Sequence, residues 1–536
     1  MRQRRRGIAS QYNVEATTRV FEISAFWRSK MIDKALIVNV DAVRTKYDTK
    51  GAASVVDALR ALVAADKARG LNGQLIDISD AATMKRYKAK AITNPKSERQ
   101  AKDAVDAVYA ALKPDYLVII DGPDVIPHMT LDNPVPKDKD KDVPSDLPYA
   151  SDTPFTSSDA AKYAAVTRVV GRIPGITGAA APDHVIKLIR ASAAFKSRRQ
   201  KDYMPYFAIS AQVWEKSTEE SVNNIFRSKA IKVCPSTGTP GVARLLTPLG
   251  HFFNCHGGEV DPQFYGQKGQ QYPVAMTSDD VAKGAKRNTI IAAECCFGAQ
   301  LFDPNWAQGK WPISNAYLEA GAIGFFGSTT TAYGPEEGNS GADLMTQYWL
   351  INALAGASLG RSCLQARQKF VAGQKMEDPV NLKTLAQFLL LGDPSLTPCL
   401  SDGPKVKAML EAIDDSAARK TRRVALTAAG KAAYDSSGFP GKKIARPAKA
   451  LHNLVRKLAR RRGMHAGSGD IEAFHIVGGE NYGREMKSRD VQQSVVVVTN
   501  HKRPTGKRPK GIPFIEVMVA HAQDNRLIRV AEYVRR

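Results

Sequence analysis

Short apolar segments alternate with amphipathic segments over roughly the first three quarters of the chain. Residues 34–41 (KALIVNVD), 74–80 (QLIDISD) and 115–122 (DYLVIIDG) are short, apolar and rich in β-branched residues, which is typical of buried strands. Between them, residues 51–70 and 97–113 place their apolar positions at helical spacing. Strands that alternate with helices of this length predict βαβ units and a parallel sheet.

The same alternation starts again after a predicted helix at 183–197. Further strands and helices are expected in turn at 204–214, 221–231, 251–258, 289–298, 313–321, 322–330, 340–356 and 384–396. The fold class is therefore α/β, with two parallel-sheet halves at 36–200 and 201–400 and flanking helices. A basic leader at 1–35 precedes them.

The composition changes at residue 401. Segments 404–435 and 445–462 read as basic helices, and four later segments read as strands of a small sheet. The stretch HAQDNRLIRV (521–530) resembles a hairpin with a polar turn. We expect residues 401–536 to form a small basic α+β module that contributes no catalytic group.

Positive charge is concentrated in this last quarter. The chain has a net charge of +24, and residues 401–536 hold 28 Lys and Arg against 13 Asp and Glu, a net +15. Such a patch suits a polyanion such as nucleic acid, an acidic partner or an anionic membrane surface, and solubility is an equally good explanation. Base stacking is not expected, because residues 401–470 hold two aromatic residues, Tyr434 and Phe439.

Other features of the sequence narrow the class of protein. There is no run of 18 apolar residues to span a membrane, and the basic start lacks the apolar stretch of a secretory signal. Six cysteines are few for 536 residues and include no C-x-x-C pair, so neither a disulfide scaffold nor a structural zinc site is expected. We therefore expect a cytoplasmic protein, without a cofactor or metal.

Reactive side chains follow two of the predicted strands. NCHGG (254–258) carries His256, and ECCFG (294–298) carries Cys295 and Cys296. Sites in open α/β sheets form beyond the carboxyl ends of the strands, and a thiolate nucleophile needs a base such as imidazole. Adjacent strand residues point to opposite faces, so one cysteine is expected to be the nucleophile and the other a small buried hydrophobe.

Six blocks in the same order resemble gingipain-like (C25) cysteine peptidases of the caspase-like clan CD. NCHGG resembles the His-Gly block of these peptidases, and AECCFG resembles their Cys block. Cys295 stands 39 positions after His256. The other blocks are DYLVIIDGPDVIP (115–127), SDLPYASD (145–152) with VVGRIPG (169–175), AYLEAGAIGFFGSTTTAYGP (316–335) and FLLLGDPSL (388–396). The resemblance covers about 36–400 and implies a caspase/gingipain-like fold and a cysteine endopeptidase acting on protein or peptide substrates.

The resemblance assigns a role to several residues. A glycine typically follows the nucleophile three positions on, which favours Cys295 because Gly298 stands there. His256 is then the general base, Asp146 matches the acidic position that orients it, and the backbone N–H groups of Gly257 and Cys295 are the oxyanion donors. Asp146 is equally well explained as a loop cap.

The resemblance also points to a substrate pocket. Ser328 and Thr329 are expected to supply backbone contacts and Tyr333 a wall, and Asp159 is a loose match to the acid that selects Arg or Lys. A solvated loop aspartate is the alternative for Asp159. The family usually has alanine where this chain has Glu294, a departure that affects local charge. Two other functions stay open: a catalytically silent caspase-like scaffold, and a nucleic-acid-binding protein with a protease-like core.

Overall fold

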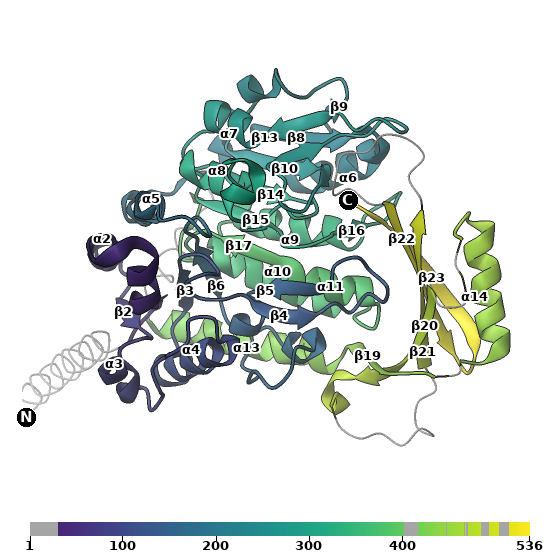
Figure 1. Cartoon of the computed structure of the whole chain (residues 1–536), viewed down its shortest axis with the longest axis horizontal. Coiled ribbons are helices and arrows are strands. Elements are labelled where there is room, and N and C mark those ends of the chain that lie inside the picture. Colours follow the sequence, from purple (N-terminus) through teal and green to yellow (C-terminus); the bar gives the residue numbers. More distant parts are fainter. Residues whose placement is uncertain are drawn as a thin grey trace, which may run out of the picture.

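One mixed sheet of ten strands forms the centre of the protein (Figure 1). This computed structural model describes residues 31–400, 416–445, 447–465, 467, 470–483, 493–502 and 514–536, so residues 1–30 of the expected basic leader and residues 404–415 of the expected helix lie outside it. The strand order is β2 (Gly73–Asp77), β1 (Lys34–Val38), β3 (Tyr116–Ile120), β6 (Val170–Ile173), β17 (Phe388–Leu391), β15 (Gly324–Ser328), β14 (Ile290–Ala293), β10 (Gly250–Asn254), β8 (Tyr206–Ala211) and β9 (Lys232–Cys234).

The two expected halves join into one continuous sheet through β17. This strand runs parallel to β6 of the first half and antiparallel to β15 of the second, whereas the other neighbouring pairs are parallel. Parallel strands covered on both faces are continuously apolar, which explains runs such as LIV and VII that do not alternate with polar residues. The α/β class with a large, mostly parallel sheet is confirmed.

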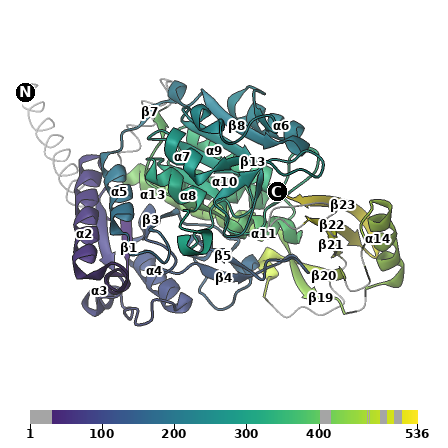
Figure 2. The same cartoon turned by 45° about the horizontal axis from the view of Figure 1, so that its top comes forward.

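Two rows of helices cover the opposite faces of this sheet (Figure 2). The first row is α2 (Val40–Ala68), α5 (Pro182–Ala194), α8 (Ile313–Glu319) and α7 (Ser278–Gly284). The second row is α13 (Ser416–Asp435), α10 (Leu359–Gly373), α9 (Ala342–Leu354) and α6 (Glu215–Phe226), with α11 (Pro379–Gln387) beside α10. Helices α3 (Ala81–Arg86) and α4 (Glu98–Leu112) belong to the first half.

Short strands extend the loops at both edges of the sheet. They are β4 (Met129–Asp132) with β5 (Asp142–Ser145), β11 (His256–Gly257) with β12 (Gln263–Tyr265) and β13 (Val274–Thr277), β7 (Arg198–Arg199) with β18 (Cys399–Leu400), and β16 (Tyr333–Gly334). β11 consists of the His-Gly pair itself, and β16 follows the loop after β15. These two short strands therefore lie in the region in which the reactive side chains were expected.

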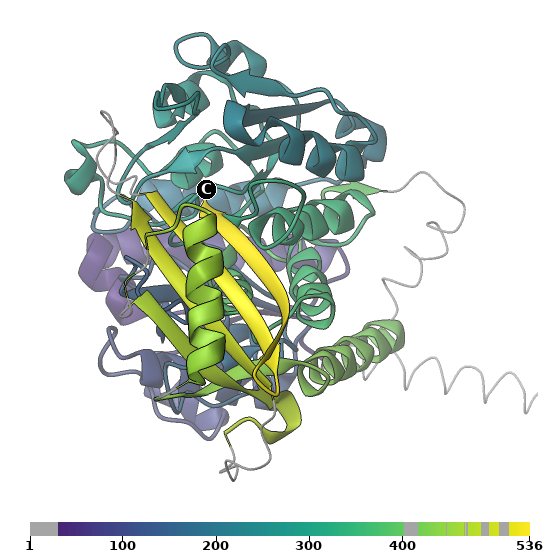
Figure 3. The ribbon, with the colours of Figure 1, turned by 90° about the vertical axis from the view of Figure 1, so that its right-hand side faces the viewer.

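A second, antiparallel sheet follows in the C-terminal part of the chain (Figure 3). Its strands are β19 (Gly438–Lys443), β20 (Ile471–Gly478), β21 (Gln493–Lys502), β22 (Phe514–Gln523) and β23 (Arg526–Arg535), and α14 (Lys449–Arg461) crosses its outer face. The predicted hairpin is confirmed, because Asp524 and Asn525 join β22 and β23 with φ values of 49° and 61°. Both values are positive, as a two-residue turn of type I′ requires.

Both faces of this sheet are buried. Val496 and Val498 point toward α14, while Val495 and Val497 of the same strand belong to a cluster with Tyr333 of the main body. Strand β23 adds to β16, so the C-terminal sheet is joined to the main body by backbone pairing as well as by side chains. The boundary expected at residue 400 stays a prediction.

Candidate active site

Neighbouring parallel strands bring the histidine and cysteine blocks to one edge of the sheet. β10 and β14 pair in register up to Phe253 and Ala293, and the His-Gly and Cys-Cys segments follow directly. The prediction that these two strands are parallel neighbours is confirmed. The segments touch, because a Cβ added at Gly257 would lie 1.8 Å from the carbonyl oxygen of Cys296. Glycine is therefore required at this position of the His256 loop.

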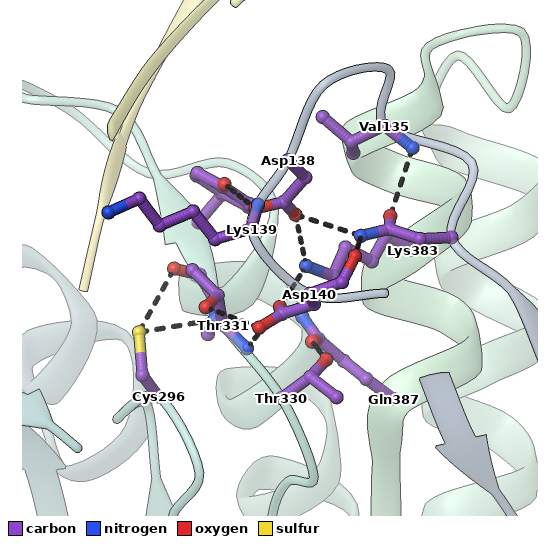
Figure 4. Close-up of polar contacts among 12 residues, drawn as sticks. Val135, Asp138, Lys139, Asp140, Cys296, Thr330, Thr331, Lys383 and Gln387 are labelled. Carbon is purple, nitrogen blue, oxygen red and sulfur yellow. Dashed lines mark hydrogen bonds and ion pairs between the residues drawn. The ribbon is translucent and has the colours of Figure 1, made fainter. Parts of the chain in front are cut away.

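The sulfur of Cys296 faces β16 and the end of the chain. It accepts a hydrogen bond from the Ala332 N–H at 3.2 Å and lies 3.5 Å from the Ala332 carbonyl oxygen (Figure 4). The Arg535 Nε lies 3.4 Å away, and the backbone carbonyl oxygen of Arg536 is also in contact with the sulfur. Burial raises the pKa of the Cys296 thiol, while the Arg535 guanidinium acts in the opposite direction and favours the thiolate.

The neighbouring Cys295 lies in a different environment. It is fully buried, its sulfur is hydrogen-bonded by the backbone of Cys255, and its carbonyl accepts from the Ser328 hydroxyl at 2.9 Å. Burial, with the Cys255 thiol beside it, raises the pKa of the Cys295 thiol well above its usual value. Cys295 thus has the surroundings expected of the small buried hydrophobe, and Cys296 is the cysteine that meets the β16 segment.

His256 begins the short strand β11 and lies among polar and aromatic side chains. Its Nε2 is 2.7 Å from the Gln267 Oε1, and the amide of Gln267 is held in this orientation because its Nε2 donates to the Gly269 carbonyl at 3.0 Å. An amide oxygen accepts hydrogen bonds, so the proton of neutral His256 is on Nε2 and Nδ1 is the basic nitrogen. The ring centroid of Trp214 lies 4.4 Å from that of His256.

A buried acidic pocket lies beside the Cys296 sulfur and holds the Arg536 side chain. The guanidinium is 3.2 Å from Glu294 through Nε and 3.0 Å from Asp343 through Nη2, and all three side chains are fully buried. It also donates to the Pro335 carbonyl at 2.8 Å and lies 4.6 Å from the ring centroid of Trp214. Burial and the negative charge of Asp343 raise the pKa of the Glu294 carboxyl well above its usual range, and Arg536 offsets part of this rise.

The pocket is built from three separate parts of the chain. Glu294 follows β14, Asp343 lies in the first turn of α9, and Gly334 in β16 leaves the space for the guanidinium. A Cβ added at Gly334 would be 2.3 Å from the Arg536 Nε. The Ser217 hydroxyl donates to Asp343 at 2.8 Å and fixes its carboxylate. The arrangement suits a planar, bidentate cation.

The predicted orienting acid, Asp146, has other partners. It accepts from the Arg172 Nε at 2.9 Å and Nη2 at 2.6 Å, and His128 lies 3.8 Å away. Burial alone would raise the pKa of Asp146, but the Arg172 guanidinium holds it below its usual value. The structure therefore pairs Asp146 with a buried arginine of β6, and Gln267 is the side chain that orients His256.

The predicted pocket acid, Asp159, caps a short helix, which neither the pocket role nor the solvated loop aspartate had anticipated. Its carboxylate accepts from the Ala161 N–H at 3.0 Å at the start of the short helix η2 (Ala160–Tyr163). The Tyr482 hydroxyl of the C-terminal part also donates to it at 3.0 Å. Asp159 thus joins the C-terminal part to the main body, and its partners Ala161 and Tyr482 are not residues of the pocket around Arg536.

The three residues expected to line the substrate divide into two groups. Ser328 and Thr329 are buried and bond inward, Ser328 to the Cys295 carbonyl and Thr329 to the Pro144 carbonyl at 2.6 Å. Tyr333 lies in β16 and pairs with Arg535 of β23, so its backbone does face an extended segment. The backbone contacts of this loop with an extended segment are therefore made by residues 332–334 and not by Ser328 and Thr329.

A buried cluster of charges supports the β16 loop from behind (Figure 4). The Lys383 ammonium forms ion pairs with Asp138 and Asp140, and all three are nearly or fully buried. Asp140 accepts from the Thr331 N–H at 2.8 Å, and Asp138 accepts from the Tyr333 hydroxyl at 2.9 Å. Burial opposes ionisation of Asp138, but Lys383 lowers its pKa below the usual value. The cluster fixes the segment that contacts the Cys296 sulfur.

Sequence reasoning missed the residues that form the acidic pocket. Glu294 was visible as an acid in the otherwise apolar stretch IIAAECC, and a buried acid at a strand end is a signal of function. Asp343 gave no such signal, because an acid in the first turn of a helix is explained by the helix dipole alone. Arg536 reaches the pocket through pairing that no local pattern predicts.

One comparison with known proteins matches the part of the chain that holds these residues. Residues 251–399, which include the histidine, both cysteines, β16 and α9, match Peptidase family C25. This match supports a cysteine peptidase in general terms, acting on protein or peptide substrates, and the mixed α/β fold is consistent with the caspase/gingipain-like type expected.

The remaining comparisons add little. No curated protein matches the chain. A solved structure described as "Structure of Protease" is similar with a TM-score of 0.44 and 11% identity, covering 94% of this chain and 97% of that one. A likeness of that size carries no weight for function.

Two properties of the described residues bear on membrane insertion and metal binding. In this part of the chain no helix is both long and apolar enough to cross a membrane. Over the same residues, His, Cys, Asp and Glu side chains form no group of three or more that could hold a metal ion.

Proposed function

We propose that this protein is a cysteine endopeptidase that uses Cys296 as its nucleophile and His256 as its general base, and that it cleaves after arginine. The observation that carries the proposal is the position of one arginine, Arg536. Its backbone carbonyl oxygen is in contact with the Cys296 sulfur while its guanidinium lies between Glu294 and Asp343. This is the arrangement expected of a P1 residue, with its carbonyl group at the nucleophile and its side chain in the specificity pocket.

The first chemical step follows from this arrangement. The Cys296 thiol passes its proton to Nδ1 of His256, and the sulfur attacks the carbonyl carbon of the P1 residue. The oxyanion that forms is stabilised by backbone N–H groups of the two touching loops, those of Gly257 and Cys296. Gly257 keeps its expected role here, while the donor and nucleophile expected at Cys295 move one residue to Cys296.

The second step regenerates the enzyme. The C–N bond breaks as protonated His256 gives its proton to the leaving amine, which leaves a thioester on Cys296. Water then attacks the thioester while His256 takes its proton, and the acid product departs as the thiol re-forms. Gln267 orients the imidazole for both steps, because its amide oxygen holds the proton of Nε2.

Specificity is assigned to Glu294 and Asp343. Two buried carboxylates around a slot of arginine shape favour a guanidinium over the compact ammonium of lysine, which cannot form the same forked contacts. Trp214 provides a flat face for the cation. An uncharged P1 side chain would leave the buried acids without a counter-charge, which disfavours binding.

A turnover assay tests the assignment. Peptide libraries with a single variable P1 residue are incubated with an Arg536→Ala chain, in which the acidic pocket is empty, and with the same chain carrying Cys296→Ala, Cys295→Ala or His256→Ala. We expect cleavage after arginine that is abolished in Cys296→Ala and His256→Ala and retained in Cys295→Ala. Loss of cleavage in Cys295→Ala with retention in Cys296→Ala contradicts the assignment. No cleavage by any folded form supports instead the silent scaffold.

A further inference from the structure

We propose that the C-terminal strand β23 is a built-in occupant of the substrate cleft, which binds as a substrate strand does and keeps the active site closed until it is displaced. The proposal rests on the proposed function, because it takes Cys296 and the acidic pocket as the place where a substrate binds. It concerns the regulation of that site.

The backbone of β23 is bound in the manner of an added strand. It runs antiparallel to β16, with Arg535 opposite Tyr333 and Val534 opposite Gly334. The pairing continues to the last residue, since the Arg536 N–H donates to the Ala332 carbonyl at 3.0 Å. Addition of an extended segment to an exposed strand edge is a general mode of peptide recognition, with main-chain bonds for affinity and alternate side-chain pockets for specificity.

The side chains of the last two residues cover the reactive groups. Arg536 fills the acidic pocket and is fully buried. Arg535 turns to the other side, where its Nη2 donates to the Gly257 carbonyl at 3.0 Å and its Nε lies 3.4 Å from the Cys296 sulfur. The thiol and the Gly257 loop are therefore both covered, and an incoming peptide cannot reach the sulfur while β23 is in place.

Neighbouring contacts hold this strand at the cleft. β23 pairs with β22 along almost its whole length, and the Tyr533 hydroxyl donates to Asp378 at 2.6 Å. The face that carries Tyr533 packs on Val380 and Tyr333 of the main body. A ligand attached in this way has an effective concentration of about millimolar, so a free peptide at micromolar concentration competes poorly with it.

Replacement of Arg536, whose side chain fills the acidic pocket, is the change expected to release β23 from the cleft. Removing the Arg536 side chain takes away the cation between two buried carboxylates while leaving the β22–β23 hairpin paired. Arg526 provides a matched control: it lies at the other end of the same strand and is exposed. Its replacement changes the net charge by the same amount far from the cleft.

The test measures access to the Cys296 sulfur and needs no peptidase activity. The full chain and its Arg536→Ala and Arg526→Ala variants are treated with iodoacetamide, and the rate of alkylation at Cys296 is followed by peptide mapping. We expect the rate to rise by about tenfold or more in Arg536→Ala, since a tenfold shift in occupancy corresponds to about 1.4 kcal/mol. Arg526→Ala should behave as the unaltered chain does.

Adding back the segment identifies the cause. A synthetic peptide of residues 526–536 should protect Cys296 in Arg536→Ala, and the same peptide ending in alanine should not. An unchanged alkylation rate in folded Arg536→Ala, or equal protection by both peptides, overturns the proposal. If Arg536→Ala does not fold, Arg536→Met keeps the bulk of the side chain and carries the same expectation.

Turnover measured in parallel separates this proposal from the proposed function. Faster alkylation together with faster cleavage of an arginyl peptide supports both. Faster alkylation with no cleavage of any peptide supports the occupied cleft and contradicts the peptidase. Cleavage by the unaltered chain at the same rate as by Arg536→Ala, with equal alkylation, leaves the peptidase intact and refutes closure by β23.

Discussion

Replacing Asp343 by asparagine tests the acidic pocket through its charge alone. Asparagine keeps the size of the side chain and can still accept from Ser217, but it removes the negative charge of the carboxylate that lies 3.0 Å from the bound guanidinium. Loss of one partner from a buried, hydrogen-bonded charge pair costs about 2 to 5 kcal/mol in binding. At about 1.4 kcal/mol for each factor of ten, this is about 30-fold to several thousandfold.

The structure places the expected effect at the lower end of that range. Asp343 raises the pKa of the Glu294 carboxyl, so removing its charge lets Glu294 ionise more easily and take over part of the interaction. We therefore expect kcat/KM for an arginyl peptide to fall by about 30- to 100-fold, or about 2 to 3 kcal/mol. The same change should leave a citrullinyl peptide, which has the shape of arginine without its charge, nearly unaffected.

The assay compares the two peptides in a chain that also carries Arg536→Ala, so that the C-terminal residue does not compete. The arginyl to citrullinyl ratio of kcat/KM is measured with and without Asp343→Asn. Asp279→Asn is the control, because Asp279 forms an exposed ion pair with Lys310 and such pairs contribute little. An unchanged ratio, or an equal loss for both peptides, refutes the assignment of Asp343 to the P1 pocket.

Two further predictions concern stability and the support of the loop. Lys383→Met leaves Asp138 and Asp140 buried without their cation, which costs about 3 to 5 kcal/mol of unfolding free energy. Urea unfolding should show this loss, and kcat should fall because the β16 loop loses its support. An unchanged kcat would contradict the supporting role of the cluster. Burial lowers the pKa of His251 to about 3, which favours the neutral imidazole in the folded state. The contribution of His251 to the free energy of unfolding is therefore lost as the pH falls from 6.5 toward 3. Between pH 6.5 and 5 this loss of unfolding free energy is about 2 kcal/mol, at 1.36 kcal/mol for each pH unit. The loss should be absent in His251→Gln. An identical dependence of stability on pH in both proteins would contradict the prediction. The comparison with the variant is needed because burial raises the pKa of Asp378 to about 7, which acts in the opposite direction over this window.

The order of strands and helices in the main body could be read from the sequence because buried parallel strands and amphipathic helices have distinct patterns. The direction of strand β17 could not be read from the sequence. Its residues FLLL are apolar on both faces, and such a run fits a central strand of either direction. The joining of two expected halves into one sheet follows from that strand, which pairs with β6 on one side and β15 on the other.

The candidate site could be predicted in part for a similar reason. Strand alternation shows that Cys295 and Cys296 point to different sides, but it does not say which side is the cleft. That depends on β16 and on the C-terminal residues, which lie 36 positions or more further along the chain. Asp146 and Asp159 stand in matching short motifs, yet their partners, Arg172 and the start of η2, are set by the fold.

The C-terminal part was expected to be a separate basic module, and its binding to a polyanion stays a prediction. Its strands were recognised from short apolar runs such as SVVVVTNHK, and the polar turn at Asp524 and Asn525 marked the β22–β23 hairpin. The position of this sheet against the main body was not predicted, because β23 pairs with β16, a two-residue strand that has no pattern of its own. A role at the cleft could be found only from the structure.

The central claim is that Cys296 is the nucleophile, and the most direct test is to locate the covalent bond that an arginyl chloromethyl ketone forms. The Arg536→Ala chain is treated with the reagent, digested and sequenced by tandem mass spectrometry, which distinguishes adjacent residues. We expect the adduct on the Cys296 sulfur, formed equally in Cys295→Ala and prevented by His256→Ala. An adduct on Cys295, or undiminished labelling in Cys296→Ala, would contradict the account.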